Sequence, residues 1–299
     1  MVTAELKTST LAPKLVAWLP LASLPAAVIW LASEGPAWVF MWTLAFAVYS
    51  GLKWLSFADG IATTRATRRR SLGYLLLWTG MDAKSFLASN AVERPLLSEW
   101  FLAIGKLALG IGFVIAGVLL VDVHGLTAGW IGMVGIVFTL HFGLFHVLSI
   151  LWRRAGIDAQ PLMDAPILAS SLSDFWGKRW NLAFRDLAHT YVFRPLVGRL
   201  GIAGATMAVF LVSGVVHDLV ISVPASGGLG LPTLYFGMQG VGVLFERSRF
   251  GKRLGTRRGI SGRLFCILFT LGPLFLVFHP PFVERVVVPM LIVLGTAGG

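Results

Sequence analysis

The sequence reads TAGWIGMVGIVFTLHFGLFHVLSIL from residue 127 to residue 151, and none of these 25 positions is Asp, Glu, Lys or Arg. About 20 mostly apolar residues are enough for an α-helix to cross the hydrocarbon core of a bilayer. The stretch therefore predicts a membrane-spanning helix, and this prediction decides the class of fold.

The composition extends that prediction to the whole chain. Of 299 residues, 56% are hydrophobic and 13% are charged, against about 45–50% and about 25% in soluble domains. A soluble protein or a disordered chain is excluded. We expect an all-α polytopic integral membrane protein, a single membrane-embedded domain over residues 1–299, with about eight spans. These lie near 15–32, 37–57, 98–121, 127–151, 200–223, 231–246, 264–279 and 282–297, and the last two could form one broken element at Pro280-Pro281.

The net charge of +11 is explained by topology. Basic residues precede the first span and fill the loops after the second, fourth and sixth spans, whereas the turns 33–36, 122–126 and 224–230 have none. Only Lys106 and Arg285 depart from this alternation. Since cytoplasmic loops carry the excess of Lys and Arg, we predict cytoplasmic termini. No nucleic-acid partner is expected.

Two cytoplasmic loops contain apolar stretches that are too short to span. Residues 71–86 follow the second span, in a loop to which we also assign Lys53, and residues 172–198 follow the fourth. Segments of this length are typical of interfacial or re-entrant pieces. In 172–198, aromatic and apolar residues recur at helical spacing, and polar residues fall largely on another face, so we expect one amphipathic interfacial helix. The two sets are Trp180, Phe184, Leu187 and Tyr191, and Lys178, Asn181 and Arg185.

One histidine lies inside a predicted span. His217 occurs in FLVSGVVHDL, residues 210–219, and ionisable residues at membrane depth are functional hypotheses by default. Asp218 points about 100° away on a helix, so it is poorly placed to orient the His217 ring. Ser213 and Gly214 share the face of His217: Ser213 is placed to bond a ring nitrogen, and Gly214 to leave space for a substrate. A structural histidine bonded to a neighbouring helix is an equal alternative at this point.

A second stretch, SLSDFWGKRWN at residues 171–181, combines aromatic, basic and amide side chains. Alone it is typical of an interfacial anchor, with rings at headgroup depth and basic groups reaching water. Asn181 fits that interpretation less well, because an amide at membrane depth needs partners or a substrate.

Together, SLSDFWGKRWN and the intramembrane His217, 36 residues after Asn181, resemble the membrane-bound O-acyltransferase superfamily, and within it the wax-synthase-like branch. GYLLLWTGMDAKSF (73–86) and HPPF (279–282) are similar to the same branch, although Thr79 stands where that branch often has proline. The resemblance covers roughly residues 70–290, and 155–220 is its most specific part.

The resemblance implies transfer of a fatty acyl group from acyl-CoA to the hydroxyl of a lipophilic alcohol, in a tunnel within the membrane. It implies His217 as general base and Asn181 as a hydrogen-bond donor to the oxyanion or to a substrate. Acyl-CoA is expected as a co-substrate, with no cofactor and no metal. We assign candidate acyl-CoA contacts to Trp176, Lys178, Arg179, Trp180 and Arg185, and supporting positions to Ser213, Gly214 and Asp218.

Two other classes of function stay open at this stage. A small lipid or solute transporter could use His217 and Asp218 as a proton relay, but it predicts internal pseudo-symmetry, which the sequence lacks. A non-catalytic membrane scaffold would need neither His217 nor Asn181. The composition favours the inner membrane of a bacterium. The acceptor alcohol, the acyl length, the oligomeric state and the roles of His141, His146 and Lys106 are left open.

Overall fold

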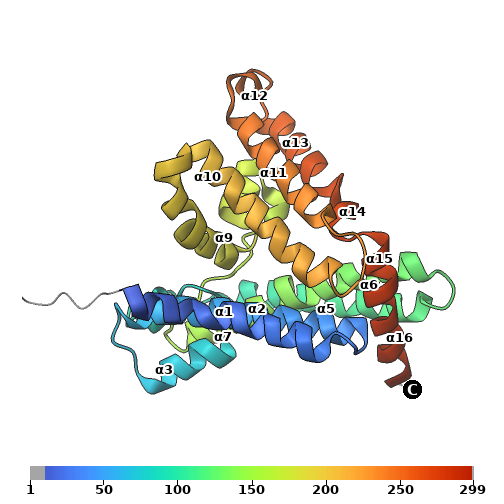
Figure 1. Cartoon of the computed structure of the whole chain (residues 1–299), viewed down its shortest axis with the longest axis horizontal. Helices are drawn as coiled ribbons and strands as arrows, with labels where there is room; N and C mark the ends of the chain where they lie inside the picture. The colour runs from blue at the N-terminus through green and yellow to red at the C-terminus, as the bar shows by residue number, and fades with distance from the viewer. Residues whose placement is uncertain (1–10, 298–299) are drawn as a thin grey trace, which may run out of the picture.

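The computed structural model describes residues 11–297, and within that range the chain is helical, with no β-strand. Figure 1 shows two groups of helices: a lower layer built from the first half of the chain, and an upper group built mainly from the second half. The all-α fold expected from the composition is therefore confirmed.

The lower layer contains two antiparallel helix pairs (Figure 1). α1 (Leu11–Ala32) packs on α2 (Ala37–Ile61), and α5 (Leu97–Leu120) packs on α6 (Gly125–Val137), which continues through the π-helical turn Phe138–Leu144 into α7 (Phe145–Arg154). A Cβ on Gly117 would lie 2.9 Å from Gly132 Cα. Glycines thus let α5 and α6 approach closely, as small residues do between membrane helices.

The upper group carries both sequence motifs. It contains α8 (Leu172–Asp174), α9 (Leu182–Ala188), α10 (Arg194–His217), α11 (Leu231–Arg247), α12 (Arg249–Arg253), α13 (Gly259–Leu271) and α14 (Leu274–Val277). α10 and α11 form an antiparallel pair. The chain then returns to the lower layer through α15 (Pro280–Phe282), the turn Val283–Val287 and α16 (Val288–Ala297), and packs on α6.

The segment 172–198 is broken, which corrects the single amphipathic helix expected there. A helical piece ends at Arg179, Trp180 is extended, and Asn181 adopts the left-handed conformation with φ 42°. A helix then starts at Leu182 and continues into α10, with a kink at Gly201 (φ 65°). Helical periodicity in the sequence does not detect such a break, because the apolar face continues across it.

The segment 71–86 is folded against the body of the protein. The turn Gly73–Leu77 and α4 (Ala83–Leu87) pack on α2, and α3 (Arg68–Leu72) packs on that turn and on α4. Tyr74, Trp78, Phe86 and Leu87 are buried and form an apolar cluster with Phe57, Leu162 and Leu187. An interfacial or re-entrant position for this segment stays a prediction.

Lys53 lies inside α2, which corrects its assignment to a loop. Lys53 is 2% exposed, and its Nζ donates to the carbonyl of Gly80 and lies 3.4 Å from the centroid of the Tyr74 ring. Lys53 thus ties the 71–86 segment to α2. The hydrogen bond to Gly80 gives this buried polar group the partner that it needs.

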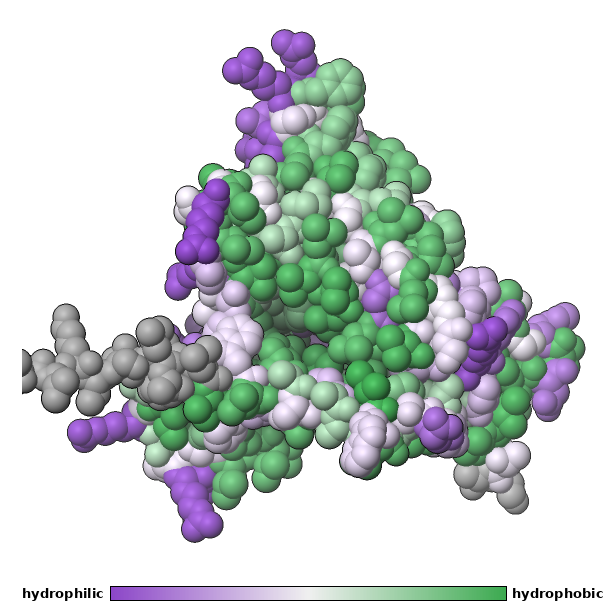
Figure 2. Space-filling model, in the orientation of Figure 1, coloured by the Kyte–Doolittle hydropathy of each residue, from purple (hydrophilic) through white to green (hydrophobic). Residues whose placement is uncertain are grey.

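Four continuous helical segments are long and apolar enough to cross a membrane: Leu97–Leu120, Gly125–Arg154, Leu182–Ser222 and Gly259–Val277. Val16–Ala32 is a shorter apolar helix. An integral membrane protein is supported, while a total of about eight spans stays a prediction. Figure 2 shows broad apolar surface over the upper group, with hydrophilic residues at the tip formed by α12 and a hollow where the two layers meet.

Candidate active site

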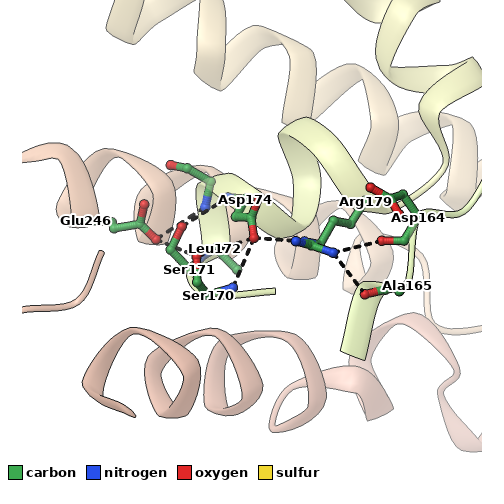
Figure 3. A network of polar contacts seen from close by, with 9 residues as sticks. Asp164, Ala165, Ser170, Ser171, Leu172, Asp174, Arg179 and Glu246 are labelled. Atoms are coloured by element: carbon green, nitrogen blue, oxygen red, sulfur yellow. Dashed lines mark hydrogen bonds and ion pairs between the residues drawn. The ribbon is translucent and has the colours of Figure 1, made fainter. Parts of the chain in front are cut away.

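The SLSDFWGKRWN segment begins with a capped helical turn. The Ser171 hydroxyl accepts a hydrogen bond from the Asp174 backbone N–H at 3.1 Å, which satisfies a donor that a helix start leaves without a partner. Glu246, at the end of α11, is 0% exposed, and its Oε2 accepts from the backbone N–H groups of Leu172 (2.7 Å) and Ser173 (3.3 Å). Figure 3 shows this carboxylate directed at the start of the segment.

A second carboxylate holds the middle of the segment. Asp174 Oδ2 accepts from the Ser170 N–H at 3.1 Å and from Arg179 Nε at 2.8 Å (Figure 3). Burial alone would raise the pKa of the Asp174 carboxyl. The bonds from Ser170 and the charge of Arg179 outweigh burial and hold that pKa below its usual value. Asp174 is therefore ionised at neutral pH and fixes the loop.

The three candidate cations differ in their surroundings. Arg179 also donates from Nη1 to the carbonyls of Asp164 (3.2 Å) and Ala165 (3.4 Å), so it closes the loop that precedes the motif (Figure 3). Arg185 binds the Asp186 carboxylate at 2.6 Å and the Gly177 carbonyl at 3.0 Å. Lys178 is exposed. Arg179 and Arg185 thus have structural contacts that the sequence did not indicate.

The two tryptophans of the motif face aromatic neighbours. Trp176 Nε1 donates to Gln239 Oε1 at 3.2 Å, and its ring lies 5.7 Å from the ring of Phe236 on α11. Trp180 stacks on Phe175, with centroids 5.4 Å apart and planes at 16°. Because an indole N–H usually finds a partner when buried, Gln239 fixes the Trp176 ring.

Asn181 shapes the backbone at the end of the motif. Its left-handed conformation is one that asparagine tolerates better than most residues. Its Oδ1 accepts from the Phe184 N–H at 3.2 Å and caps α9. The amide nitrogen Nδ2 makes no hydrogen bond to the described residues 11–297, so it is the group through which Asn181 could reach a substrate.

His217 is the last residue of α10 and is half-buried. Its Nδ1 lies 2.7 Å from the backbone carbonyl oxygen of Ser213. A carbonyl oxygen can only accept, so Nδ1 carries the proton and Nε2 of the neutral ring has a free lone pair. Within residues 11–297 no side chain or backbone group hydrogen-bonds Nε2. In that tautomer Nε2 is the ring nitrogen that is left to accept a proton.

The contacts of Ser213 and Gly214 refine their predicted roles. Ser213 does bond a ring nitrogen of His217, through its carbonyl and not its hydroxyl. A Cβ on Gly214 would lie 2.6 Å from Thr233 Cα. The expectation that Gly214 leaves room for a substrate is therefore wrong: α11 fills that space, and the glycine lets α10 and α11 come together.

Asp218 is 9% exposed and binds the start of α11. Its carboxylate accepts from the backbone N–H groups of Gly230 (2.8 Å) and Thr233 (3.0 Å), from the Thr233 hydroxyl, and from the Ser222 hydroxyl (3.0 Å). A carboxylate at a helix N-terminus is favoured by the helix dipole. With four donors directed at it, Asp218 has no free position for a proton relay with His217, which removes the basis of the transporter alternative.

α11 connects the two motifs, a role that neither motif indicates in the sequence. Along this helix Thr233 binds Asp218, Phe236 contacts both His217 and Trp176, Gln239 bonds Trp176, and Glu246 caps the start of SLSDFWGKRWN. At the end of an apolar run and next to Arg247, Glu246 is typical in sequence of a residue at the membrane interface, yet its side chain is buried. A signal was present: Gln239 and Glu246 are seven residues apart, so two polar groups of an apolar span share one helix face.

The fold and this geometry define a class: an all-helical membrane protein in which the His217 ring, bonded through Nδ1 to the Ser213 carbonyl, contacts Phe236, and Phe236 in turn contacts Trp176 of the SLSDFWGKRWN segment. Comparison with known proteins points to one family. Residues 159–236 match the model of the membrane bound O-acyl transferase family. The resemblance that the two motifs predict is therefore confirmed.

Three curated relatives illustrate the likeness. A "Long-chain-alcohol O-fatty-acyltransferase" of Simmondsia chinensis is 32% identical over 136 residues, which cover 40% of this chain and 38% of the relative. "Probable long-chain-alcohol O-fatty-acyltransferase 9" of Arabidopsis thaliana is 30% identical over 155 residues (47% and 46%). "Acyl-CoA--sterol O-acyltransferase 1" of the same plant is 30% identical over 92 residues (28% and 27%). The chain thus spans less than half the length of these relatives.

Proposed function

We propose that this protein is an acyl-CoA-dependent O-acyltransferase that transfers a fatty acyl group to the hydroxyl of a lipophilic alcohol. The observation that carries the proposal is the His217 imidazole, whose Nδ1 is bonded to the Ser213 carbonyl and whose Nε2 is hydrogen-bonded by none of residues 11–297. The names of the relatives support an acyl transfer to an alcohol or a sterol. The comparisons give no support to a transporter.

The proposed reaction is a direct transfer. His217 Nε2 takes the proton of the acceptor hydroxyl as its oxygen attacks the thioester carbonyl carbon. The positive charge on the ring is stabilised by the Ser213 carbonyl, which accepts from Nδ1–H. The tetrahedral intermediate then expels the CoA thiolate, the C–S bond breaks, and His217 returns the proton to sulfur. The products are an ester and free CoA, and no covalent acyl-enzyme is formed.

Asn181 is proposed as the second polar group of the site. Because its Oδ1 is used by the Phe184 N–H, the Nδ2 donor is left to bind the developing oxyanion or to position a substrate. Donors of this kind are effective when they are already oriented before charge develops. The left-handed backbone and the cap of α9 supply that orientation.

Acyl-CoA is proposed to approach on the side that carries SLSDFWGKRWN. Lys178 is the exposed cation of this motif, and Trp176 and Trp180 supply apolar surface next to it. Arg179 and Arg185 are proposed to keep the loop in shape and to offer their remaining N–H groups to phosphate. The alternation of basic loops supports cytoplasmic termini and the inner membrane of a bacterium, where CoA is available.

An acyl-transfer assay tests the proposal. Detergent-purified protein receives labelled palmitoyl-CoA and, in turn, long-chain alcohols, a sterol and diacylglycerol, and esters are detected by mass spectrometry. We expect an ester with at least one alcohol. His217→Ala should lower turnover by about 10²–10⁴-fold, the usual contribution of a general base. His189→Ala should retain turnover, because His189 is exposed and stacks on Phe193 in the helical turn before α10. Equal turnover in His217→Ala would contradict the proposed base.

A further inference from the structure

We propose that His279 is a positioning residue for His217. Through Ser222 and Asp218, it fixes the junction between α10 and α11 and so sets the position of the catalytic imidazole against α11. This inference rests on the proposed function. It concerns the HPPF stretch, 62 residues beyond His217 in the sequence, for which the sequence alone suggests no role.

The donor and the acceptor in each hydrogen bond of the His279 ring can be assigned from its partner. The Phe282 backbone N–H can only donate, and it lies 3.2 Å from His279 Nδ1, so Nδ1 is the acceptor. In a neutral ring the proton is then on Nε2, which lies 3.1 Å from the Ser222 hydroxyl oxygen. His279 therefore donates to Ser222, and the first turn after Pro280-Pro281 fixes its tautomer.

The hydrogen bond from His279 determines where the Ser222 hydroxyl proton points. Because its oxygen accepts from His279, its single proton is directed at Asp218 Oδ1 at 3.0 Å, with the Gly228 carbonyl as a second acceptor at 3.2 Å. Asp218 then holds Gly230 and Thr233 at the start of α11. One chain of bonds thus joins the C-terminal segment to the residue that follows His217.

The packing around His279 leaves no space for the residues of this hydrogen-bond network to shift. The His279 side chain is 0% exposed. A Cβ on Gly228 would lie 2.5 Å from His279 Nε2, and Gly228 has φ +73°, a conformation that favours glycine. The same loop is held a second time by Arg285, which donates to the carbonyls of Ala225 (3.1 Å) and Ser226 (3.0 Å).

This network affects the position of His217 because of how residues are spaced at the end of α10 and along α11. His217 directly precedes Asp218, and Phe236 lies three residues after Thr233, on the same face of α11. The Phe236 ring contacts the His217 ring at a centroid distance of 4.4 Å. A shift of the α11 start relative to Asp218 therefore moves Phe236 against the imidazole, and small misplacements of a catalytic group cost up to about 10²-fold in rate.

Two conservative variants separate the two bonds of His279. His279→Gln keeps a donor at the position of Nε2, whereas His279→Asn keeps an acceptor at the position of Nδ1 and loses the donor to Ser222. Ser222→Ala removes the next link. We expect kcat for ester formation about 10- to 100-fold lower in His279→Asn and Ser222→Ala, an unchanged KM for acyl-CoA, and at least partial recovery of kcat in His279→Gln.

A second measurement follows the network itself. Hydrogen exchange of the peptide that contains Gly230 and Thr233 should become faster in His279→Asn and Ser222→Ala, and stay close to wild type in His279→Gln. The inference would be overturned if His279→Asn and Ser222→Ala both kept wild-type kcat and wild-type exchange. An inactive His217→Ala in the same assay would show that the proposed function still stands. A wild-type protein that makes no ester from any alcohol would overturn the proposed function first, and this inference with it.

Discussion

The Phe236 ring lies against the His217 imidazole, with centroids 4.4 Å apart and planes inclined by 41°. The same Phe236 ring lies 5.7 Å from the indole of Trp176. One aromatic side chain on α11 therefore contacts both motifs that the sequence suggests as functional. We call Phe236 the spacer, because its ring contacts His217 of one motif and Trp176 of the other.

The first prediction concerns this spacer. Phe236→Leu keeps an apolar side chain but removes the flat face against His217, so we expect kcat to fall by about 10-fold or more while the melting temperature in detergent changes little. Phe245→Leu is the matched control, because Phe245 is on the same helix but stacks on Phe265, at 5.7 Å. Equal kcat losses in both variants would indicate a general packing effect and not alignment of His217.

The sequence predicts the membrane class and the central histidine for clear physical reasons. Long apolar runs have few alternatives to a helix in lipid, and an ionisable group within such a run stands out. The tertiary partners are not predictable in the same way. Glu246 meets the backbone of Leu172 and Ser173 across 73 or more residues of chain, and nothing in the local pattern specifies that contact.

The break at Asn181 illustrates the same limit on a shorter scale. The apolar periodicity from Trp180 to Tyr191 is real, but whether the backbone continues as a helix depends on one residue in the left-handed region. Asparagine is enriched there without being confined to it. The function of the side chain as a cap therefore emerged only from the structure.

The second prediction separates the cap from the proposed chemistry of Asn181. Asn181→Asp retains an oxygen that accepts from the Phe184 N–H, so we expect the stability to stay near wild type, but it replaces the Nδ2 donor with an acceptor. Turnover should fall by about 10²–10³-fold, as for loss of an oxyanion donor. Asn181→Ala should in addition lower the stability by about 1–2 kcal/mol, because it loses the cap. Steady-state kinetics and thermal melts of the two variants provide the comparison, and a fully active Asn181→Asp would exclude the donor role.

The third prediction uses the contrast between two neighbouring cations. Lys178 is exposed, whereas Arg179 binds Asp174 at 2.8 Å and two backbone carbonyls. Lys178→Glu should raise the KM for acyl-CoA several-fold, more than that for the alcohol, with an unchanged melting temperature. Arg179→Glu should lower the melting temperature, because it places a second carboxylate beside Asp174 and opens the loop. If Lys178→Glu leaves both KM values unchanged, Lys178 does not contact the donor.

The last prediction tests the close approach of α10 and α11. A methyl group on Gly214 would lie 2.6 Å from Thr233 Cα and 3.2 Å from Thr233 Oγ1, the hydroxyl that binds Asp218. Gly214→Ala should therefore destabilise the protein by about 1–3 kcal/mol, as overpacking does, and lower kcat by displacing the His217 helix from its partner. Gly237→Ala is the control, since its methyl would meet only Leu211, at an ordinary 3.8 Å. In thermal melts and acyl-transfer assays, Gly214→Ala should be less stable and slower than Gly237→Ala. A Gly214→Ala protein with wild-type stability and rate would show that α10 and α11 tolerate a wider spacing than the one that holds Asp218 on Thr233.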